Sequence, residues 1–376
     1  SRPKQFMDPG LGMSLLEATI RRAAALDVRG DILIVAHRDH VAPIVEECRT
    51  LPAEIREKIV VLGEPEAKNT APAIAVSMAF LGGGAAENAG PAVGRTALVL
   101  AADHLITPFE LFRDAVTAAD ELASEGYLVT FGVTPTRAET GYGYIEAGEE
   151  HGPGHLVHAF REKPDRETAE QYYASGKHFW NSGMFVFEQG AFGRELAAHA
   201  PGVAEAARAA AGARGGAEPQ ATDGAGFPAR TEHGMRIAGK SEALEAAYAA
   251  APKISIDYAL MEQSTRVAMV PVAFTWNDVG SWDEIAALSE RGMLDPEAAL
   301  TPMASGADTE TSRPPTVEVD AGGNFVFSEL PVALAGVEDL IVVVRNGRVL
   351  ITKKGESQLV KRIVDALAES ERGDIL

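Results

Sequence analysis

The stretch ALVLAAD, residues 97–103, is an unbroken apolar run that ends in a carboxylate. A continuous run of this kind favours a β-strand that is buried on both faces, as in the sheets of α/β proteins. Ligands of such sheets bind beyond the carboxyl ends of the strands. Asp103 is therefore predicted to face a ligand crevice, where it would suit a hard metal ion such as Mg²⁺. A helix-capping role explains an aspartate at this position equally well.

Further apolar runs rich in β-branched residues predict more strands, and amphipathic stretches lie between or before them. The predicted strands are residues 32–36, 58–63, 97–103 and 127–133, and the predicted helices are residues 14–26, 40–51, 71–81 and 109–123. Alternation of strands and helices at this spacing predicts an α/β fold with a mostly parallel sheet covered on both faces.

The chain changes character after this first part. Residues 140–190 predict shorter strands and loops. Residues 201–245 are rich in Ala, Gly and charge, which predicts a surface helix and a mobile loop. The polar, Pro-containing stretch 300–316 predicts a linker.

The C-terminal part predicts a small β-rich domain. Short apolar runs at nearly regular spacing fill residues 317–352, and a helical pattern covers about 356–369. The regular spacing would suit a few rungs of a β-solenoid. We therefore expect two domains, residues 1–298 and residues 299–376.

Composition excludes several classes of partner. The formal net charge is −20, so nucleic acid and anionic membrane surfaces are poor partners, and no apolar run reaches the length of a membrane span. The single cysteine, Cys48, rules out an internal disulfide and suits a reducing cytoplasm. Its helical context predicts a core-facing side chain. An acidic protein that binds an anionic small molecule must place a few cations or a metal ion locally.

A second candidate metal ligand is Asp278, in the stretch TWNDVGSW, residues 275–282. Taken alone, it is a turn residue in an aromatic-packed loop. Two carboxylates from distant segments, with no His or Cys partner, favour Mg²⁺ over Zn²⁺. The histidines show no spacing typical of metal ligands.

Two polar motifs would suit a phosphorylated sugar. REKPD, residues 161–165, places Glu162 and Lys163 at a predicted strand end, where Lys163 would neutralise a phosphate. An exposed ion pair explains the local sequence better. FWNSGMF, residues 179–185, offers Asn181 for sugar hydroxyls, and a plain turn before a strand explains it equally well.

EPEAKNTAPAIA, residues 64–75, follows a predicted strand and opens a predicted helix. Asn69 or Thr70 would cap that helix, which explains most of the pattern. The cap does not explain why Glu64 and Pro65 stand at the strand end, in the position of a ligand contact.

Taken together and in order, these segments resemble one family, the mannose-1-phosphate guanylyltransferases (GDP-mannose pyrophosphorylases), among the sugar-1-phosphate nucleotidylyltransferases. The matching stretches cover essentially the whole chain: RPKQF, SLLEATIRR, EPEAKNTAPAIA, LAADHLI, FGVTPTRAETGYGYI, FREKPD, FWNSGMF, ISIDYALME, WNDVGSW and ALAGVEDLIVVVRNGRVLITKKGESQLVK. The elements NTAPA, WNSGMF and SIDYALME are specific to the mannose branch, whereas the DH and EKP elements are shared more widely.

The resemblance implies a Rossmann-like nucleotidyltransferase domain followed by a small left-handed β-helix-like domain. It implies transfer of GMP from GTP to mannose 1-phosphate with Mg²⁺, giving GDP-mannose and pyrophosphate. A relative with another base or sugar specificity and a non-catalytic, GDP-mannose-binding regulatory relative are the alternatives, because guanine preference rests on the resemblance alone. Exposed strand edges in the β-helix-like domain would pair with a second copy, so a homodimer is expected.

The resemblance also assigns roles to individual residues. The implied catalytic residues are Lys4, Asp103, Lys163 and Asp278; the implied metal ligands are Asp103 and Asp278; the sugar-phosphate contacts are Gly143, Glu162, Lys163 and Asn181; the nucleotide contacts are Glu64, Pro65, Asn69, Thr70 and Ala71. Both reactants are polyanions, with roughly −1.5 to −2 charges on each phosphate monoester. Positioning and electrostatics would supply the acceleration, and neither a covalent enzyme group nor a general base is required.

Family members carry a first strand and a glycine-rich loop of the type GGxGTRLWPLS before the PKQF segment. The sequence opens on SRPKQF, without Met. We expect a trimmed or mis-started version of a normal enzyme, with weak or absent activity in the chain as given. The alternatives are a poorly folded fragment and a non-catalytic relative. Some relatives continue into an isomerase domain, whereas a single activity is expected for this chain.

Overall fold

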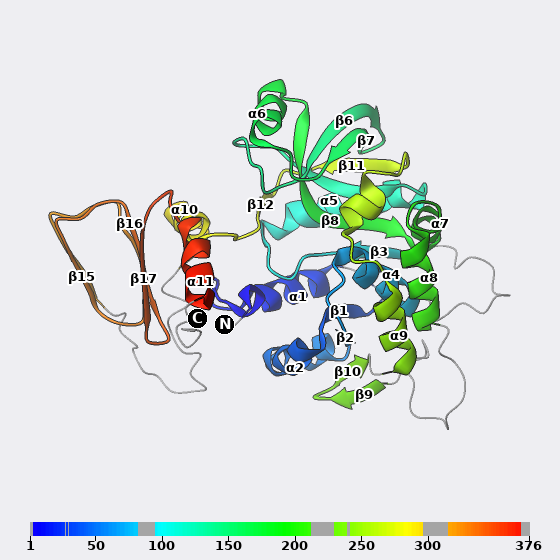
Figure 1. Cartoon of the computed structure of the whole chain (residues 1–376), viewed down its shortest axis with the longest axis horizontal. Helices are drawn as coiled ribbons and strands as arrows, with labels where there is room; N and C mark the ends of the chain where they lie inside the picture. Colours follow the sequence, from blue (N-terminus) through cyan, green and yellow to red (C-terminus); the bar gives the residue numbers. More distant parts are fainter. Residues whose placement is uncertain are drawn as a thin grey trace. The chain divides into compact units, whose positions relative to one another are not determined.

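The computed structural model describes residues 3–26, 28, 30–81, 95–211, 229–238, 241–295 and 315–369 (Figure 1). The chain forms two compact units. Unit 1 consists of Ser1–Ile20, Ala102–Leu105 and Asn277–Leu376, and unit 2 consists of Arg21–Ala101 and Ile106–Trp276. Three elements contribute residues to both units: α1 (Leu15–Ala25), β4 (Leu105–Thr107) and β12 (Thr275–Asn277).

Unit 2 contains two sheets and the helices that cover them. Its strands are β1 (Ile32–His37), β2 (Ile59–Glu64), β3 (Thr96–Val99), β5 (Leu128–Val133), β6 (Tyr144–His151), β7 (Gly154–Arg161), β8 (His178–Glu188), β9 (Ala229–Glu232), β10 (Met235–Ala238) and β11 (Val267–Pro271). Its helices are η2 (Arg38–His40), α2 (Val41–Cys48), α3 (Ala53–Arg56), α4 (Thr70–Leu81), α5 (Phe109–Ser124), α6 (Arg166–Ser175), α7 (Gln189–His199), α8 (Pro201–Ala211), α9 (Glu242–Ala250) and the π-helical η3 (Asp257–Met261).

The predicted α/β fold class is confirmed, and the sheets are mixed rather than mostly parallel. One sheet has the order β1-β2-β10-β9, in which β1, β2 and β10 run parallel. The other has the order β3-β8-β5-β11-β7-β6, and its described pairings are antiparallel except β5 with β11. Strands β6 and β7 pair antiparallel as a hairpin, and β8 runs antiparallel to both of its neighbours, β3 and β5.

The strands and helices predicted up to residue 133 are confirmed within a few residues, except for the strand at 97–103. Strand β3 ends at Val99, and its residues are exposed or half-buried rather than buried on both faces, because β3 lies at the edge of its sheet. Residues 201–245 differ from the prediction, because they also contain β9 and β10. Figure 1 shows these strands beside β1 and β2, which lie far away in sequence. The predicted mobile loop and linker fall almost wholly on residues outside the described ones.

Apolar packing holds unit 2 together. Every residue of β2 before Glu64 is buried, and α5 packs against β8, β5 and β11. Two clusters fill the space between sheets and helices, one around Phe187 and Tyr248 and the other around Phe112 and Phe131. The predicted burial of the free Cys48 is confirmed. Within the described residues, no helix combines the length and apolarity needed to cross a bilayer.

Unit 1 contains the C-terminal β-structure. Its elements are η1 (Lys4–Phe6), α10 (Trp282–Glu290), β13 (Thr316–Val319), β14 (Phe325–Ser328), β15 (Val332–Ala335), β16 (Leu340–Arg345), β17 (Arg348–Lys353) and α11 (Leu359–Glu369). The short strands predicted at regular spacing are confirmed.

The pairings within this β-structure are those of a β-helix. Thr316 pairs in parallel with Val332 and Phe325 with Ile341, so one coil takes 16 residues (332 − 316 and 341 − 325). Strand β17 then pairs antiparallel with β16. The β-helix-like second domain expected from the sequence is thereby confirmed.

Candidate active site

Three charged residues from distant segments meet in unit 1. The Lys4 Nζ atom lies 2.9 Å from Asp103 Oδ2 and donates a hydrogen bond of 2.5 Å to the backbone oxygen of Asp278. The side chains of Lys4 and Asp103 remain 33% and 31% exposed, so a ligand in solution can still reach both charges. Sequence reasoning named all three residues, and the structure brings them together.

The segment that carries Asp278, residues 277–281, is held in an unusual conformation and is called the Asp278 loop below. Val279 has a φ of +51°, a value that β-branched residues rarely adopt. Its backbone N–H donates to Asn277 Oδ1 at 2.6 Å. A Cβ atom at Gly280 would lie 2.9 Å from Asp278 Oδ2, so a side chain at this position would displace the carboxylate.

The carboxylates near Lys4 fit a hard divalent cation that takes most of its ligands from substrate and water. Mg²⁺ is usually bound by one or two carboxylates, and substrate phosphates and water complete its octahedron. Asp103 and Asp278 would supply such carboxylates. The described part of the chain holds no group of three or more His, Cys, Asp or Glu side chains with metal-binding geometry, so a closed all-protein cage is not formed there.

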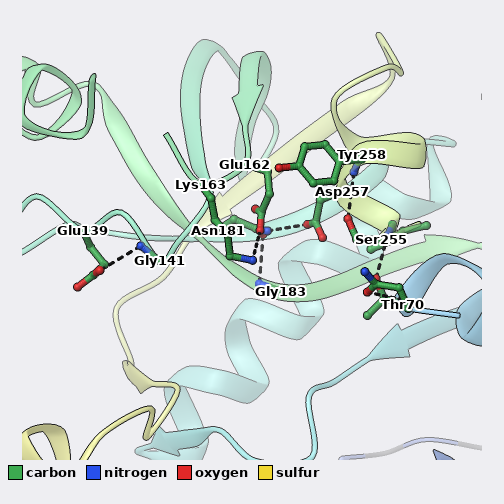
Figure 2. A network of polar contacts seen from close by, with 12 residues as sticks. Thr70, Glu139, Gly141, Glu162, Lys163, Asn181, Gly183, Ser255, Asp257 and Tyr258 are labelled. Atoms are coloured by element: carbon green, nitrogen blue, oxygen red, sulfur yellow. Dashed lines mark hydrogen bonds and ion pairs between the residues drawn. The ribbon is translucent and has the colours of Figure 1, made fainter. Parts of the chain in front are cut away.

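Asn181 is the centre of a polar network in unit 2 (Figure 2). Only 8% of Asn181 is exposed. Its Oδ1 atom accepts hydrogen bonds from Thr130 Oγ1 at 3.0 Å and from the Gly183 N–H at 3.2 Å. Its Nδ2 atom donates to Asp257 Oδ1 at 2.9 Å, and its backbone N–H donates to the Gly143 oxygen at 2.8 Å. These contacts fix the amide and leave one side-chain N–H for a ligand.

Glu162 and Lys163 lie beside this network, as Figure 2 shows. Lys163 Nζ is 2.8 Å from Glu162 Oε1; the lysine side chain is 60% exposed and the glutamate only 10%. The hydrogen bond from Lys163 to Glu162 raises the pKa of the lysine above its ordinary value. The Glu162 backbone N–H donates to Glu262 Oε1 at 2.8 Å, which ties the REKPD turn to the SIDYALME stretch.

Sequence reasoning missed Asp257. Burial, and then the charge of Glu162, raise the pKa of this carboxyl to about 6. A buried carboxylate with a strongly raised pKa marks a candidate functional group. The sequence did carry a signal, because Asp257 is a lone carboxylate in the otherwise mostly apolar run ISIDYALM.

The predicted nucleotide-binding segment begins where β2 ends. Glu64 Oε1 accepts a hydrogen bond of 2.9 Å from the Tyr248 hydroxyl. Burial raises the pKa of Glu64, although the Tyr248 hydrogen bond opposes this shift. Pro65, the next residue, is buried. The Glu64 carboxylate is therefore held in place by the hydrogen bond from Tyr248.

The rest of that segment is hydrogen-bonded to residues 254–256, directly before Asp257. Asn69, with φ of +71°, accepts a hydrogen bond from the Thr70 N–H on its Oδ1 atom at 2.8 Å. Thr70 Oγ1 accepts from the Ile256 N–H at 2.8 Å, and the Ala71 N–H donates to the Ile254 oxygen at 3.2 Å. A continuous chain of contacts thus runs from Thr70 through residues 256–257 to Asn181.

The predicted site residues therefore form two groups, one in each unit. Unit 1 holds Lys4, Asp103 and Asp278, and unit 2 holds the two remaining sets: Glu64, Pro65, Asn69, Thr70 and Ala71, and Gly143, Glu162, Lys163 and Asn181.

Comparison with known protein families covers both parts of the chain. The family described as "Nucleotidyl transferase" matches residues 1–292. The family described as "MannoseP isomerase/GMP-like beta-helix domain" matches residues 315–367.

Individual relatives match nearly the full length of this chain. Mannose-1-phosphate guanylyltransferase RfbM of Salmonella typhimurium is 34% identical over 99% of this chain and 69% of its own length. Xanthan biosynthesis protein XanB of Xanthomonas campestris is 33% identical over 100% of this chain and 70% of its own length. A crystal structure from Thermus thermophilus, described as a mannose-1-phosphate geranyltransferase, is 31% identical, covers 98% of this chain and 93% of that one, and superposes with a TM-score of 0.73. The chain therefore belongs to the nucleotidyl transferase family, in the branch of the mannose-1-phosphate guanylyltransferases.

Proposed function

We propose that this protein transfers GMP from GTP to mannose 1-phosphate and forms GDP-mannose and pyrophosphate. The observation that carries the proposal is the meeting of Lys4, Asp103 and Asp278 in a chain that matches relatives named for this activity over 99% of its own length. The reaction joins two polyanions, and a site of this composition supplies the charges that such a reaction needs.

Members of the nucleotidyl transferase family generally use a divalent metal. Here Asp103 and Asp278 would hold Mg²⁺, which when bound neutralises phosphate oxygens and acts as a Lewis acid. Lys4 has three N–H donors, and the described contacts with Asp103 and the Asp278 carbonyl use two of them. The third is available to a phosphate oxygen. Lys4 would thus hold the two acidic segments together and donate to the nucleotide.

The Asn181 network would bind the sugar phosphate. Asn181 would donate its remaining N–H to a sugar hydroxyl, and Glu162 would accept from another. The exposed ammonium of Lys163, held by Glu162, would neutralise the attacking phosphate. That phosphate is already ionised near neutral pH, so the side chains need only orient it in line with the α-phosphorus of GTP.

The stretch from Glu64 to Ala71 would hold the nucleotide. Support comes from its place at the carboxyl end of β2, where ligands of parallel strands bind. Its hydrogen bonds to residues 254–256 would fix the position of the nucleotide segment relative to Asp257 and Asn181.

The assay that tests the proposal measures pyrophosphate release by the full-length gene product with GTP, mannose 1-phosphate and Mg²⁺. Release that requires all three components is expected. A panel of the four nucleoside triphosphates with mannose and glucose 1-phosphates tests base and sugar choice. Absence of pyrophosphate, with calorimetric binding of GDP-mannose, would instead identify a binding protein.

Gly143→Ala is expected to raise the KM for mannose 1-phosphate about tenfold, because small displacements of positioning groups are costly. The added Cβ atom would lie 2.5 Å from Glu162 Oε2 and 3.3 Å from Asn181 Cβ. Gly141→Ala is the matched control, since its Cβ would meet only Glu139, at 3.3 Å for the nearest atom. Equal KM values for the two variants would contradict the role of Glu162 in sugar binding.

We also propose a cytoplasmic homodimer. GTP is a cytoplasmic substrate, and the outer strand β17 exposes apolar side chains, with Val349 64% and Ile351 59% exposed. Strand β17 also lies at the edge of its sheet, and an exposed edge strand is a ready template for pairing with another chain. Light scattering after size exclusion would give twice the monomer mass, and a monomer at micromolar concentration would contradict the proposal.

A further inference from the structure

Residues next to the candidate metal ligands pack in the same hydrophobic core as the C-terminal β-structure. Leu105 follows Asp103 by two residues, and Val279 follows Asp278 directly; these two apolar side chains are 4% and 2% exposed. Both belong to one cluster of unit 1. That cluster also contains four side chains of β14 and β16: Phe325, Phe327, Ile341 and Val343. The spacing of the two acidic segments therefore depends on packing against the β-structure.

The backbone conformation of Val279 shows why the Asp278 loop in particular depends on this packing. Its φ of +51° is unfavourable for a β-branched residue, and such a conformation persists only where the surroundings enforce it. The enforcing contacts are the cluster around the buried side chain and the hydrogen bond from its N–H to Asn277 Oδ1. Weaker packing would let the backbone relax, and the Asp278 carboxylate would move with it.

A second connection joins the end of the β-structure to the helix that follows the loop. The Asp283 carboxylate, in the first turn of α10, accepts hydrogen bonds from the Gly355 N–H at 2.7 Å and the Ser357 N–H at 3.0 Å. It also accepts one from the Ser357 hydroxyl. Burial alone would raise the pKa of Asp283, but these hydrogen bonds lower it, so the carboxylate is ionised at neutral pH.

The neighbouring aromatic side chain adds packing to the same connection. The Trp282 ring lies 5.4 Å from the Phe327 ring, centroid to centroid. Trp282 and Asp283 thus fix the start of α10 against β14 and against the turn before α11. The start of α10 directly follows the Asp278 loop, and Ser281 caps the helix through the Glu284 N–H at 3.2 Å.

We infer that the C-terminal β-structure positions the metal-binding loop of this enzyme, with Asp283 and Ser357 as positioning residues that act through Asp278. The inference rests on the proposed metal site. The β-structure then serves the reaction itself, because it sets the distance between the two acidic segments to which the cation binds. A merely structural connection would affect unfolding and leave the affinity of the folded protein for the cation unchanged.

The test measures binding of Mn²⁺, an Mg²⁺ substitute, by the loss of its free electron paramagnetic resonance signal, with no turnover needed. Asp283→Asn is expected to raise the Kd about tenfold, as is typical when a supporting partner of a metal ligand is lost. The asparagine N–H₂ group would face the Ser357 donors. Glu290→Gln is the control. Glu290 lies at the other end of α10, its side chain is 61% exposed, and loss of its 2.5 Å ion pair with Lys354 should leave the Kd unchanged.

Ser357→Ala keeps the Asp283 charge and is expected to raise the Kd about threefold, which tests the connection even if Asp283→Asn fails to fold. A folded Asp283→Asn or Ser357→Ala protein with the original Kd would overturn the inference. Asp103→Asn and Asp278→Asn report on the metal site itself. If these two variants also bind Mn²⁺ normally, the proposed site is wrong, which is a different outcome from failure of the positioning role.

Discussion

Asp103→Asn is expected to lower kcat about a thousandfold at saturating substrates, because it would remove a charged ligand of the proposed Mg²⁺ ion. Asparagine has nearly the shape of aspartate, so the packing next to Leu105 should persist. The lost ion pair with Lys4 is about one third exposed and would contribute under about 1 kcal/mol to stability. The measurement is steady-state pyrophosphate release over a range of Mg²⁺ concentrations, together with thermal unfolding.

Asp114→Asn is the matched control for this prediction. Asp114 is 65% exposed, lies on α5 and pairs only with Arg113 among the described contacts, at 3.1 Å. Its loss should change neither kcat nor the Mg²⁺ dependence. An Asp103→Asn protein with kcat within threefold of the original would remove Asp103 from the catalytic machinery, and with it the metal role proposed here.

Asp257→Asn is expected to stabilise the protein at pH 7.5 by about 1–3 kcal/mol, a large effect for one substitution. Burial and the Glu162 charge raise the pKa of Asp257 from 3.8 to about 6, so the ionised form is unfavourable in the folded state. Asparagine keeps an acceptor for the Asn181 amide and carries no charge. Urea unfolding at several pH values measures the difference.

The pH dependence has a defined sign. In the unfolded chain Asp257 loses its proton near pH 4, whereas in the folded protein it keeps the proton until about pH 6. The folded state therefore binds more protons between these pH values. The contribution of Asp257 to the free energy of unfolding falls as pH rises through this window and is constant above it. Glu162 and Lys163 are the charged groups that influence Asp257 most. The Asn variant should lack this fall.

Two further variants complete the test. Asp257→Ala removes the acceptor for Asn181 Nδ2 and is expected to lower kcat/KM for mannose 1-phosphate about thirtyfold. Asp120→Asn, at an exposed position of α5, should show the original pH dependence. A lower stability of Asp257→Asn than of the original protein at pH 7.5 would show that the charge of Asp257 is well solvated or well paired. A stabilising loss of charge would show that the natural aspartate is retained for function at a cost in stability.

Local patterns predicted most of the elements, because strand and helix formation depends on neighbours within a turn or a pleat. The buried run of β2, the amphipathic α5 and the short strands of the C-terminal domain were all predicted this way. The β9–β10 hairpin was missed, because it joins a sheet only through the pairing of β10 with β2, which is far away in sequence. The direction of the strands in the larger sheet was missed for the same reason.

The candidate site shows the same division. The resemblance, which rests on the order of the motifs, named Lys4, and it agreed with the residue types at Asp103, Asp278 and Lys163. The role of Asp257 was not visible, because burial raises its pKa and burial is a property of the folded chain.

The sequence by itself determined the fold class, the family and the set of charged groups, since these follow from local periodicity and from motif order. Only the tertiary structure decided which groups meet. It brings the Lys4 ammonium to a carbonyl 274 positions away, and it buries Val279 among side chains of the β-structure. Such contacts depend on chain segments that are distant in sequence, and no local pattern specifies their partners.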